Sequence, residues 1–316
     1  YHQYAWRDVM SQVFRVDTYY LAAFNLDRIV GVLPLARLKS FIFGDFLVSL
    51  PYFNNGGALA DSVEIEEQLR LCAEKLGEQL GVSHIEFRYA ERVLPISTVR
   101  KDKVSMMLAL PDNSDELFNQ LSSKLRSQIR RPKREGAQTQ VGGKELILSF
   151  YAVFSKNMRD LGTPVYPLSF FSTILKSFPL SAKILVVHIN NIPVAAAFLI
   201  GHNGTMEIPW ASSLRDFNHL SVNMQLYWEA LKYSIDQGYR SFDFGRCTMG
   251  GGTYNFKKQW GAKPVQLNWY YWMNNGGNLP QINPSNPKYR IFISIWKQLP
   301  LWFVNWLGPK IIKHLP

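Results

Sequence analysis

The 316-residue chain has little cysteine, no metal-binding histidine pattern and no long apolar run. Its two cysteines, Cys72 and Cys247, lie far apart, which excludes a disulfide framework and fits a reducing cytoplasm. The histidines follow no zinc-ligand spacing, so we expect no metal site. No uninterrupted apolar stretch approaches the roughly 20 residues of a membrane-spanning helix. The first residues show no basic segment followed by an apolar run, so no signal peptide is visible in them.

Acidic residues are also scarce, with 24 Asp and Glu against 35 Lys and Arg and a net charge of +11. Such an excess favours an anionic partner, whether nucleic acid, a phosphorylated substrate or an anionic membrane surface, and does not choose among them. Hydrophobic residues make up 47% of the chain, which excludes a disordered protein. The length favours two domains of roughly 150 residues each.

The expected secondary structure repeats along the chain. Each half contains a helix, a meander of strands, a helix, a strand, a connection and a strand, which indicates a duplicated α/β unit. We predict a first domain over 1–112, a basic linker helix over 113–136 and a second domain over 137–275. An amphipathic, aromatic segment follows over 276–316. The linker helix is expected to run unbroken from Ser114 until Pro132 stops it.

The most informative stretch covers residues 241–260 and reads SFDFGRCTMGGGTYNFKKQW. Phe242 and Phe244 alternate with Asp243, which predicts a strand with the aromatics on one face and the carboxylate on the other. The glycines that follow let the backbone approach a ligand closely. Thr253 is expected to cap a helix that begins at Tyr254.

A strand end, a glycine loop and a cationic helix start favour a site for an anionic group or a developing oxyanion. An ordinary strand–loop–helix with solvated lysines is the alternative. A second basic cluster lies in KLRSQIRRPKREG at 124–136, where Arg126 and Arg130 fall on one helical face. Such a pair suits a diphosphate, although a solvated basic face is an equally good interpretation.

These motifs resemble the FemAB family, the tandem-GNAT transferases whose best-understood members move an amino acid from aminoacyl-tRNA to a peptidoglycan precursor. The resemblance rests on the basic stretch 124–136 and on FDFGRC followed by YNFKKQWGA. Residues 30–57, 159–167 and 256–262 are similar to FemAB-like proteins of exosortase/PEP-CTERM exopolysaccharide loci. The resemblance implies an α/β (α+β) fold of two tandem GNAT-like domains, with mixed sheets flanked by helices.

Two features depart from the expected pattern. A GNAT enzyme that uses acetyl-CoA has a glycine-containing pyrophosphate loop, but the corresponding SSLRDFNHLSVNMQ at 212–225 contains no glycine. Without glycine, the loop cannot easily present its backbone N–H groups to a pyrophosphate. Family members that act on peptidoglycan often carry a coiled-coil arm, and no long heptad stretch occurs here.

Residue chemistry and the resemblance together suggest roles for individual residues. Lys257 matches the Phe-Lys lysine of the family and would stabilise an oxyanion. Asp243 would orient or deprotonate the amine, or would pair with Arg246 in a structural role. Tyr52 would stack on a sugar beside an acceptor-binding loop. The expected substrate-binding residues are Tyr52, Asn54, Asn55, Gly56, Gly57, Arg126, Arg130, Arg159, Tyr166, Trp210, Arg246, Tyr254 and Phe256.

We therefore expect an acyltransferase that forms an amide on an amino sugar or peptide of a cell-envelope or exopolysaccharide precursor. No cofactor is expected to stay bound, and the donor is aminoacyl-tRNA or acyl-CoA. The acceptor is lipid- or nucleotide-linked, tRNA is a candidate partner, and the aromatic C-terminal segment fits either a membrane surface or packing between domains. The alternatives are an acyl-CoA-dependent enzyme and a non-enzymatic GNAT pair that binds an anionic glycolipid or nucleic acid.

Overall fold

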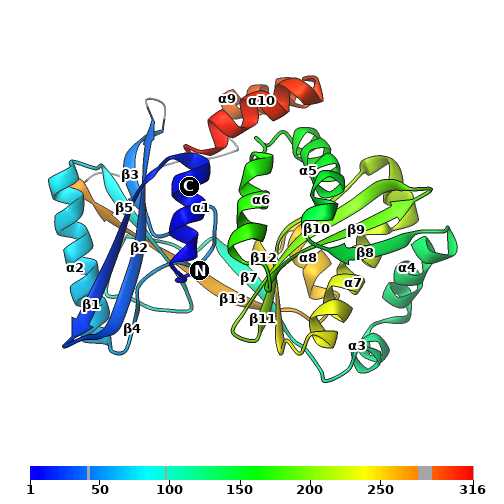
Figure 1. Ribbon diagram of the computed structural model, residues 1–316, viewed down its shortest axis with the longest axis horizontal. Helices are drawn as coiled ribbons and strands as arrows, with labels where there is room; N and C mark the ends of the chain where they lie inside the picture. The colour runs from blue at the N-terminus through cyan, green and yellow to red at the C-terminus, as the bar shows by residue number, and fades with distance from the viewer. Residues whose placement is uncertain (41–42, 97, 277–286, 316) are drawn as a thin grey trace. The chain divides into compact units, whose positions relative to one another are not determined.

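The computed structural model describes residues 1–40, 43–96, 98–276 and 287–315, without the side chains at 275 and 287–290. Part of the predicted C-terminal segment, residues 277–286 and 316, lies outside the described residues. The chain forms two compact units (Figure 1). The first contains Tyr1–Val104 with the described parts of Val265–Pro284 and Lys310–Pro316, and the second contains Ser105–Pro264 with the described part of Ser285–Pro309.

The first unit is a mixed sheet in the order β1-β2-β3-β5-β13, with β4 beside β2 and β6 beside β13. Strands β3 and β5 run parallel, and the other pairs are antiparallel. The elements are α1 (Ala5–Phe14), β1 (Asp17–Asn25), β2 (Arg28–Ser40), β3 (Gly44–Val48), β4 (Leu59–Ala60), α2 (Val63–Leu80), β5 (His84–Ala90), β6 (Val99–Arg100) and β13 (Lys263–Met273).

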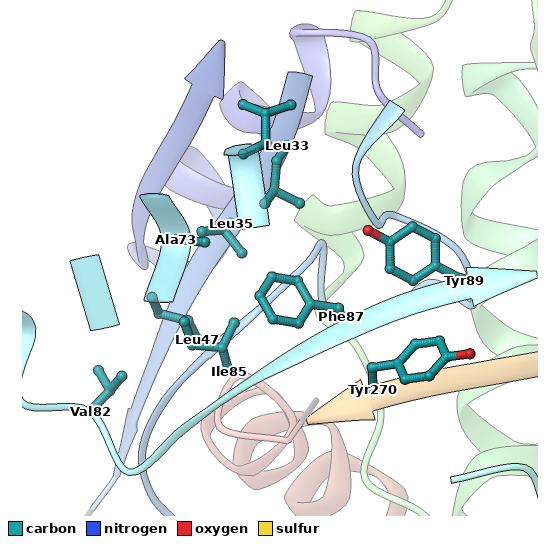
Figure 2. Packing of buried hydrophobic residues seen from close by; sticks show 10 residues of the cluster. Leu33, Leu35, Leu47, Ala73, Val82, Ile85, Phe87, Tyr89 and Tyr270 are labelled. Carbon is teal, nitrogen blue, oxygen red and sulfur yellow. The ribbon is translucent and has the colours of Figure 1, made fainter. Parts of the chain in front are cut away.

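Helix α2 covers one face of this sheet. Ser62 caps its start by accepting a hydrogen bond from the Ile65 N–H, and Gly81 ends it with a left-handed φ of 64°. Leu69 and Ala73 face the sheet and are buried. The core that they join draws side chains from β2, β3, β5 and β13 (Figure 2): Leu33, Leu35, Leu47, Ile85, Phe87 and Tyr270.

The second unit is a sheet in the order β7-β12-β11-β10-β9-β8 with helices on both faces. Strands β11 and β12 run parallel, whereas β8, β9, β10 and β11 form an antiparallel meander. The elements are β7 (Lys103–Ala109), α3 (Ser114–Gln120), α4 (Ser123–Arg134), β8 (Gln138–Gly142), α5 (Ile147–Leu161), α6 (Leu168–Ser177), β9 (Ala182–Ile189), β10 (Ile192–His202), β11 (Thr205–Ser213), α7 (Val222–Asp236), β12 (Ser241–Thr248), α8 (Gly252–Lys258), α9 (Pro287–Trp296) and α10 (Leu301–Ile312).

A β-bulge in β11 decides which of its residues share a face. Phe198 of β10 lies opposite Trp210, and Ile200 lies opposite Glu207, with a register shift between the pairs. Because directly opposed residues share a face, Glu207 and Trp210 both point to the side covered by α5 and α6. Trp210 packs there against Phe171 of α6, with ring centroids 5.2 Å apart.

Strand β12 confirms the predicted alternation. Phe242 and Phe244 are buried, and Phe244 packs on Tyr227 of α7 at 5.7 Å. Asp243 points to the other face, where it lies opposite Glu207 of β11. Helix α7 therefore covers the face opposite α5 and α6, and the strand presents a carboxylate on the side away from its own aromatic core.

The prediction of one linker helix ended by Pro132 is wrong. Leu121 is extended and ends α3, and Ser122 caps the new helix α4 by accepting a hydrogen bond from the Leu125 N–H. Pro132 lies inside α4, which continues to Arg134. Proline removes one helical N–H, but its ring is buried beside α7 together with Ile129, and this burial offsets the loss.

The predicted cap at Thr253 is also wrong. Helix α8 begins at Gly252, its N-cap is Gly251, and no side chain caps it. Gly251 donates its N–H to the carbonyl of Thr248 over 3.1 Å, which turns the chain into the helix two residues earlier than expected. The glycines thus supply the turn itself.

Buried polar groups on one face of the first unit form a hydrogen-bonded network. Arg88 donates through Nε to Glu86 Oε1 over 2.6 Å, and Tyr271 donates its hydroxyl to Glu86 Oε2 over 2.5 Å. Burial alone would raise the pKa of Glu86, but the Arg88 charge and these hydrogen bonds lower it. Nearby His84 stacks on Phe46, and burial lowers the pKa of its imidazole to about 4.

We expect His84 to make the protein less stable in acid. Its folded pKa is about 4 against 6.5 for the free group, so the unfolded chain binds more protons between these values. The free energy of unfolding therefore falls as pH falls through this window, by at most roughly 3 kcal/mol. Urea unfolding of wild type and His84→Gln between pH 4 and 7 measures the difference, and the variant should show a flatter dependence. Equal slopes would contradict this role.

Candidate functional site

A pocket of about 330 Å³ opens in the second unit where β11 and β12 separate. The two strands pair from Thr205 to Glu207 of β11 and from Ser241 to Asp243 of β12, and the pocket lies further along β11. It is also bounded by α5 and by the starts of α7 and α8. Its lining residues are Asn157, Ala211, Ser212, Ser213, Asn223, Leu226, Tyr227, Gly252, Thr253 and Phe256.

The pocket lining is uncharged and combines polar with apolar side chains. Asn157 of α5 donates through Nδ2 to the Ser212 hydroxyl over 3.1 Å, which fixes both groups on one wall. Tyr227 and Phe256 form an aromatic wall with ring centroids 4.9 Å apart. Amide and hydroxyl groups beside aromatic rings suit the neutral part of a ligand, such as an acyl or aminoacyl chain.

The glycine-free stretch 212–225 forms the start of α7 in an unusual way. A short 3-10 turn over Arg215–Leu220 replaces the expected loop, and Ser221 then adopts a left-handed φ of 63°. No side chain caps α7, and Asn223 of its first turn lines the pocket. The chain therefore reaches the pocket through a rigid turn, without the flexible glycines that would wrap a pyrophosphate.

Two carboxylates lie side by side at the last paired position of the parallel strands. Glu207 of β11 is directly opposite Asp243 of β12. Asp243 Oδ1 accepts hydrogen bonds from the Ser105 hydroxyl over 2.5 Å and from the Gly245 N–H over 2.7 Å. Burial and then the Asp243 charge raise the pKa of Glu207 well above its usual value, and burial raises the pKa of Asp243. Two carboxylates this close repel each other when both are ionised, which favours protonation of one of them.

Lys257 is a buried cation next to this pair, with 4% of its surface exposed. Its Nζ donates to the carbonyls of Gly245 over 2.8 Å and Arg246 over 3.1 Å. Gly245 has a φ of 77°, which bends β12 so that both carbonyls face the lysine. Burial lowers the pKa of Lys257, and Cys247, Asp243 and Glu207 oppose that shift.

The other predicted site residues of the second unit lie in separate places. Phe256 lines the pocket, Arg246 is exposed beside the lysine, and Tyr254 is half-buried in α8. Trp210 and Tyr166 are packed together among the aromatic side chains of α6 and β10, with ring centroids 5.8 Å apart. Arg159 pairs with Asp160 at 2.8 Å. The structure thus brings Asp243, Arg246 and Lys257 together and leaves the remaining roles as predictions.

The basic cluster lies on the outer side of α4. Leu125 and Ile129 are buried on its inner side, toward α7. Arg130 is exposed and its guanidinium lies 4.9 Å from the Phe118 ring, whereas Arg126 is half-buried. The exposed basic residues of α4 are Lys124, Arg130, Arg131, Lys133 and Arg134. This pattern forms a basic surface that fits an extended anion.

In the first unit, the predicted acceptor loop closes the gap between its own parallel strands. The N–H groups of Gly56 and Gly57 both donate to the carbonyl of Arg88 on β5, over 3.1 and 2.7 Å. The carbonyl of Asn54 accepts from the Trp269 indole over 3.1 Å, and Asn55 is exposed. Tyr52 donates its hydroxyl to the Lys313 carbonyl over 3.1 Å. The glycines here provide close backbone packing, and acceptor binding by the loop stays a prediction.

Sequence reasoning missed Glu207, Ser105 and the polar pocket residues. Glu207 stands in an ordinary strand pattern, and its position beside Asp243 depends on strand register and on the bulge in β11. Ser105 lies 138 positions before Asp243. No local signal links such residues. Among the described residues, no group of His, Cys, Asp and Glu could hold a metal ion.

Residues 123–258 match the family model "Acetyltransferase (GNAT) domain". No curated protein matches the sequence. Among solved structures, FemX is 13% identical with a TM-score of 0.63 over 92% of this chain and 93% of its own. L-PGS from Bacillus licheniformis is 13% identical with a TM-score of 0.57 over 92% and 93%. A tandem GNAT protein from the clavulanic acid biosynthesis pathway is 10% identical, with a TM-score of 0.51 over 87% and 95%.

These similarities show the fold. The chain has a mixed α/β fold of two tandem GNAT-like domains, as the sequence predicts, and it shares this fold with FemX, which agrees with the fold that the FemAB resemblance implies. The finer resemblance to proteins of exosortase/PEP-CTERM loci stays a prediction.

We expect Gly57→Ala to destabilise the protein, because an added methyl group would collide with the Tyr89 ring. Forced repacking of this kind costs about 1–3 kcal/mol. Urea unfolding at neutral pH measures the change, with Asn55→Ala as the control, because Asn55 is exposed in the same loop and should shift stability by less than about 0.5 kcal/mol. A Gly57→Ala variant as stable as wild type would argue against the packing role.

Proposed function

We propose that this protein is an amide-forming transferase that moves an acyl or aminoacyl group onto an amine of a cell-envelope or exopolysaccharide precursor. The GNAT domain match and the shared fold support an acyltransferase. The observation that carries the proposal is the combination of the uncharged pocket, the Glu207–Asp243 pair and the buried Lys257 in the second unit. These groups supply a place for a neutral acyl chain, a proton acceptor and a fixed cation.

In the proposed reaction, the amine nitrogen attacks the carbonyl carbon of the donor. A C–N bond forms, and the C–O bond of an aminoacyl ester or the C–S bond of a thioester breaks. The Glu207–Asp243 pair accepts the proton that the amine loses and passes it to the oxygen or sulfur of the leaving group as that group departs. Lys257 uses two of its three N–H donors on the carbonyls of Gly245 and Arg246, so its charge stays fixed beside β12.

The pocket favours an aminoacyl ester over acyl-CoA as the donor. None of its lining residues is charged, and the 3-10 turn before α7 replaces a pyrophosphate loop. The phosphates of a tRNA would instead meet a basic surface such as that of α4. Acyl-CoA remains the second candidate donor because the family model that matches is an acetyltransferase domain.

The acceptor is proposed to be a sugar or peptide linked to a lipid or nucleotide. The names of two similar structures, FemX and a lysylphosphatidylglycerol synthetase C-terminal domain from Agrobacterium fabrum, favour cell-envelope chemistry, and the second points to a lipid acceptor. A lipid-linked acceptor places the enzyme at the cytoplasmic surface of the membrane. The resemblance of residues 30–57, 159–167 and 256–262 to proteins of exosortase/PEP-CTERM loci would favour an exopolysaccharide precursor.

A non-enzymatic GNAT pair that binds an anionic glycolipid or nucleic acid is the alternative from another class. The basic surface of α4 favours it, because that surface binds anions without any chemistry at β12. This alternative predicts binding that is lost in Arg126→Ala/Arg130→Ala and unaffected by changes at Lys257.

We expect Lys257→Met to reduce transfer by about 10²–10³-fold, as the loss of an electrostatic stabiliser does. Methionine is unbranched like lysine, is one atom shorter and removes the charge. Lys258→Met is the matched control, because Lys258 is the exposed neighbour and should retain activity. Activity is measured with amine acceptors and charged tRNA, and circular dichroism verifies the fold of each variant. A folded Lys257→Met enzyme with wild-type activity would remove Lys257 from the mechanism.

We expect purified protein to bind charged tRNA in preference to uncharged tRNA at the same salt, and to show no saturable binding of acyl-CoA. Fluorescence titration with each ligand measures this. Phe256→Ala enlarges the pocket and should reduce the preference for the charged form, whereas Arg131→Ala on α4 should weaken both forms alike. Saturable binding of acyl-CoA at micromolar concentrations would contradict aminoacyl-tRNA as the donor and favour acyl-CoA.

A further inference from the structure

The two C-terminal helices each present an exposed apolar stripe. On α9, Ile291 and Ile295 are 64% and 57% exposed, and on α10, Trp302 and Trp306 are 71% and 55% exposed. Residues four positions apart lie on one face of a helix. We refer to these four side chains as the C-terminal apolar face. Large exposed aromatics of this kind mark interaction sites when they gather on one surface.

The same helices are fixed to the second unit by their other sides. Trp296 of α9 and Val304 of α10 are almost fully buried. Gly308 lies so close to Val165 that an added methyl group would collide with it. The helices are therefore held to the protein through these buried positions, while the four residues of the C-terminal apolar face stay more than half exposed.

The charge of this region fits an anionic surface. No Asp or Glu follows Asp243 in the sequence, whereas the two helices and the residues next to them contain several cations. Lys297, between the helices, is exposed. The cations of the region are Lys288, Arg290, Lys297, Lys310 and Lys313. Apolar and aromatic side chains combined with lysine and arginine are typical of helices that bind anionic lipid.

Helix length favours a position on the bilayer surface. Helix α9 has 10 residues and α10 has 12, which correspond to about 15 and 18 Å at 1.5 Å per residue. The hydrocarbon core of a bilayer is about 30 Å thick. Of the helices in the described parts of the chain, none is long and apolar enough to cross it. Tryptophan prefers the headgroup level of a bilayer, where its ring is partly apolar and partly hydrated.

Another exposed apolar group in the protein lacks this charge pattern. Phe24, Leu26 and Ile29 are exposed at the turn between β1 and β2. Asp27 lies within this turn, and Asp61 pairs with Arg28 next to it at 3.5 Å. Nearby carboxylates would be repelled by anionic lipid. Charge therefore singles out the C-terminal apolar face.

We propose that the C-terminal apolar face docks the protein onto an anionic phospholipid bilayer, with Trp302 and Trp306 inserted at the headgroup level. The docking does not require the proposed transfer reaction, but it would hold the enzyme where a lipid-linked acceptor resides. Its occupant is the bilayer surface, because a second protein copy would bring the same excess of positive charge to the interface.

The test is co-sedimentation of the full chain with vesicles, without donor or acceptor, so a failed transfer reaction does not affect the result. Wild type should bind vesicles that contain 30% phosphatidylglycerol, and its affinity for them should fall as the salt concentration rises. Its affinity for vesicles of pure phosphatidylcholine should be roughly tenfold lower. Trp302→Ala/Trp306→Ala should bind the anionic vesicles about tenfold or more weakly. Leu180→Ala is the matched control, because Leu180 is 90% exposed elsewhere in the second unit and should bind as wild type does.

Two outcomes would overturn the proposal. The first is a folded double variant that binds anionic vesicles as tightly as wild type. The second is a wild-type protein that does not bind the anionic vesicles at low salt. If such a protein dimerises and the double variant is monomeric in analytical ultracentrifugation, the face is a protein interface instead.

Discussion

The parallel pairing of β11 and β12, and its end at Glu207 and Asp243, is the constraint on which the second unit depends. Paired strands hold the two carboxylates side by side, and separated strands leave room for the uncharged pocket. The positive φ of Gly245 then turns two carbonyls of β12 toward Lys257, which anchors α8 to the strand. The end of the strand pairing thus coincides with a pocket, a pair of neighbouring carboxylates and a buried lysine.

The first unit repeats the parallel pair but fills the gap. Strands β3 and β5 run parallel, as β11 and β12 do. After β3, however, the chain folds back so that Gly56 and Gly57 bond to the Arg88 carbonyl of β5, and Arg88 donates in turn to the Phe53 carbonyl over 2.6 Å. The backbone itself satisfies the polar groups that a ligand would otherwise meet. The gap that the loop fills in the first unit thus corresponds to the pocket of the second unit.

Local sequence signals predict strand β12 closely, because alternation in residues 241–244 gives its two faces. The same kind of argument fails at Pro132, because burial of its ring against α7 compensates for the missing N–H. It fails at Thr253, because two glycines start α8 earlier. Predictions from local sequence hold where the segment's own conformational preference dominates its folding free energy. They fail where tertiary packing or glycine backbone freedom contributes a free energy of similar size.

The sequence by itself determined the duplicated α/β organisation, the carboxylate on β12 and the lysine that follows the glycine loop. These depend on periodicity, glycine and charge within short segments. Only the tertiary structure decided that Lys257 is buried on two carbonyls, that Glu207 stands beside Asp243, and that Trp302 and Trp306 face outward while Trp296 is buried. Strand register, a β-bulge and helix packing set those positions, and each arises from contacts between residues that are distant along the chain.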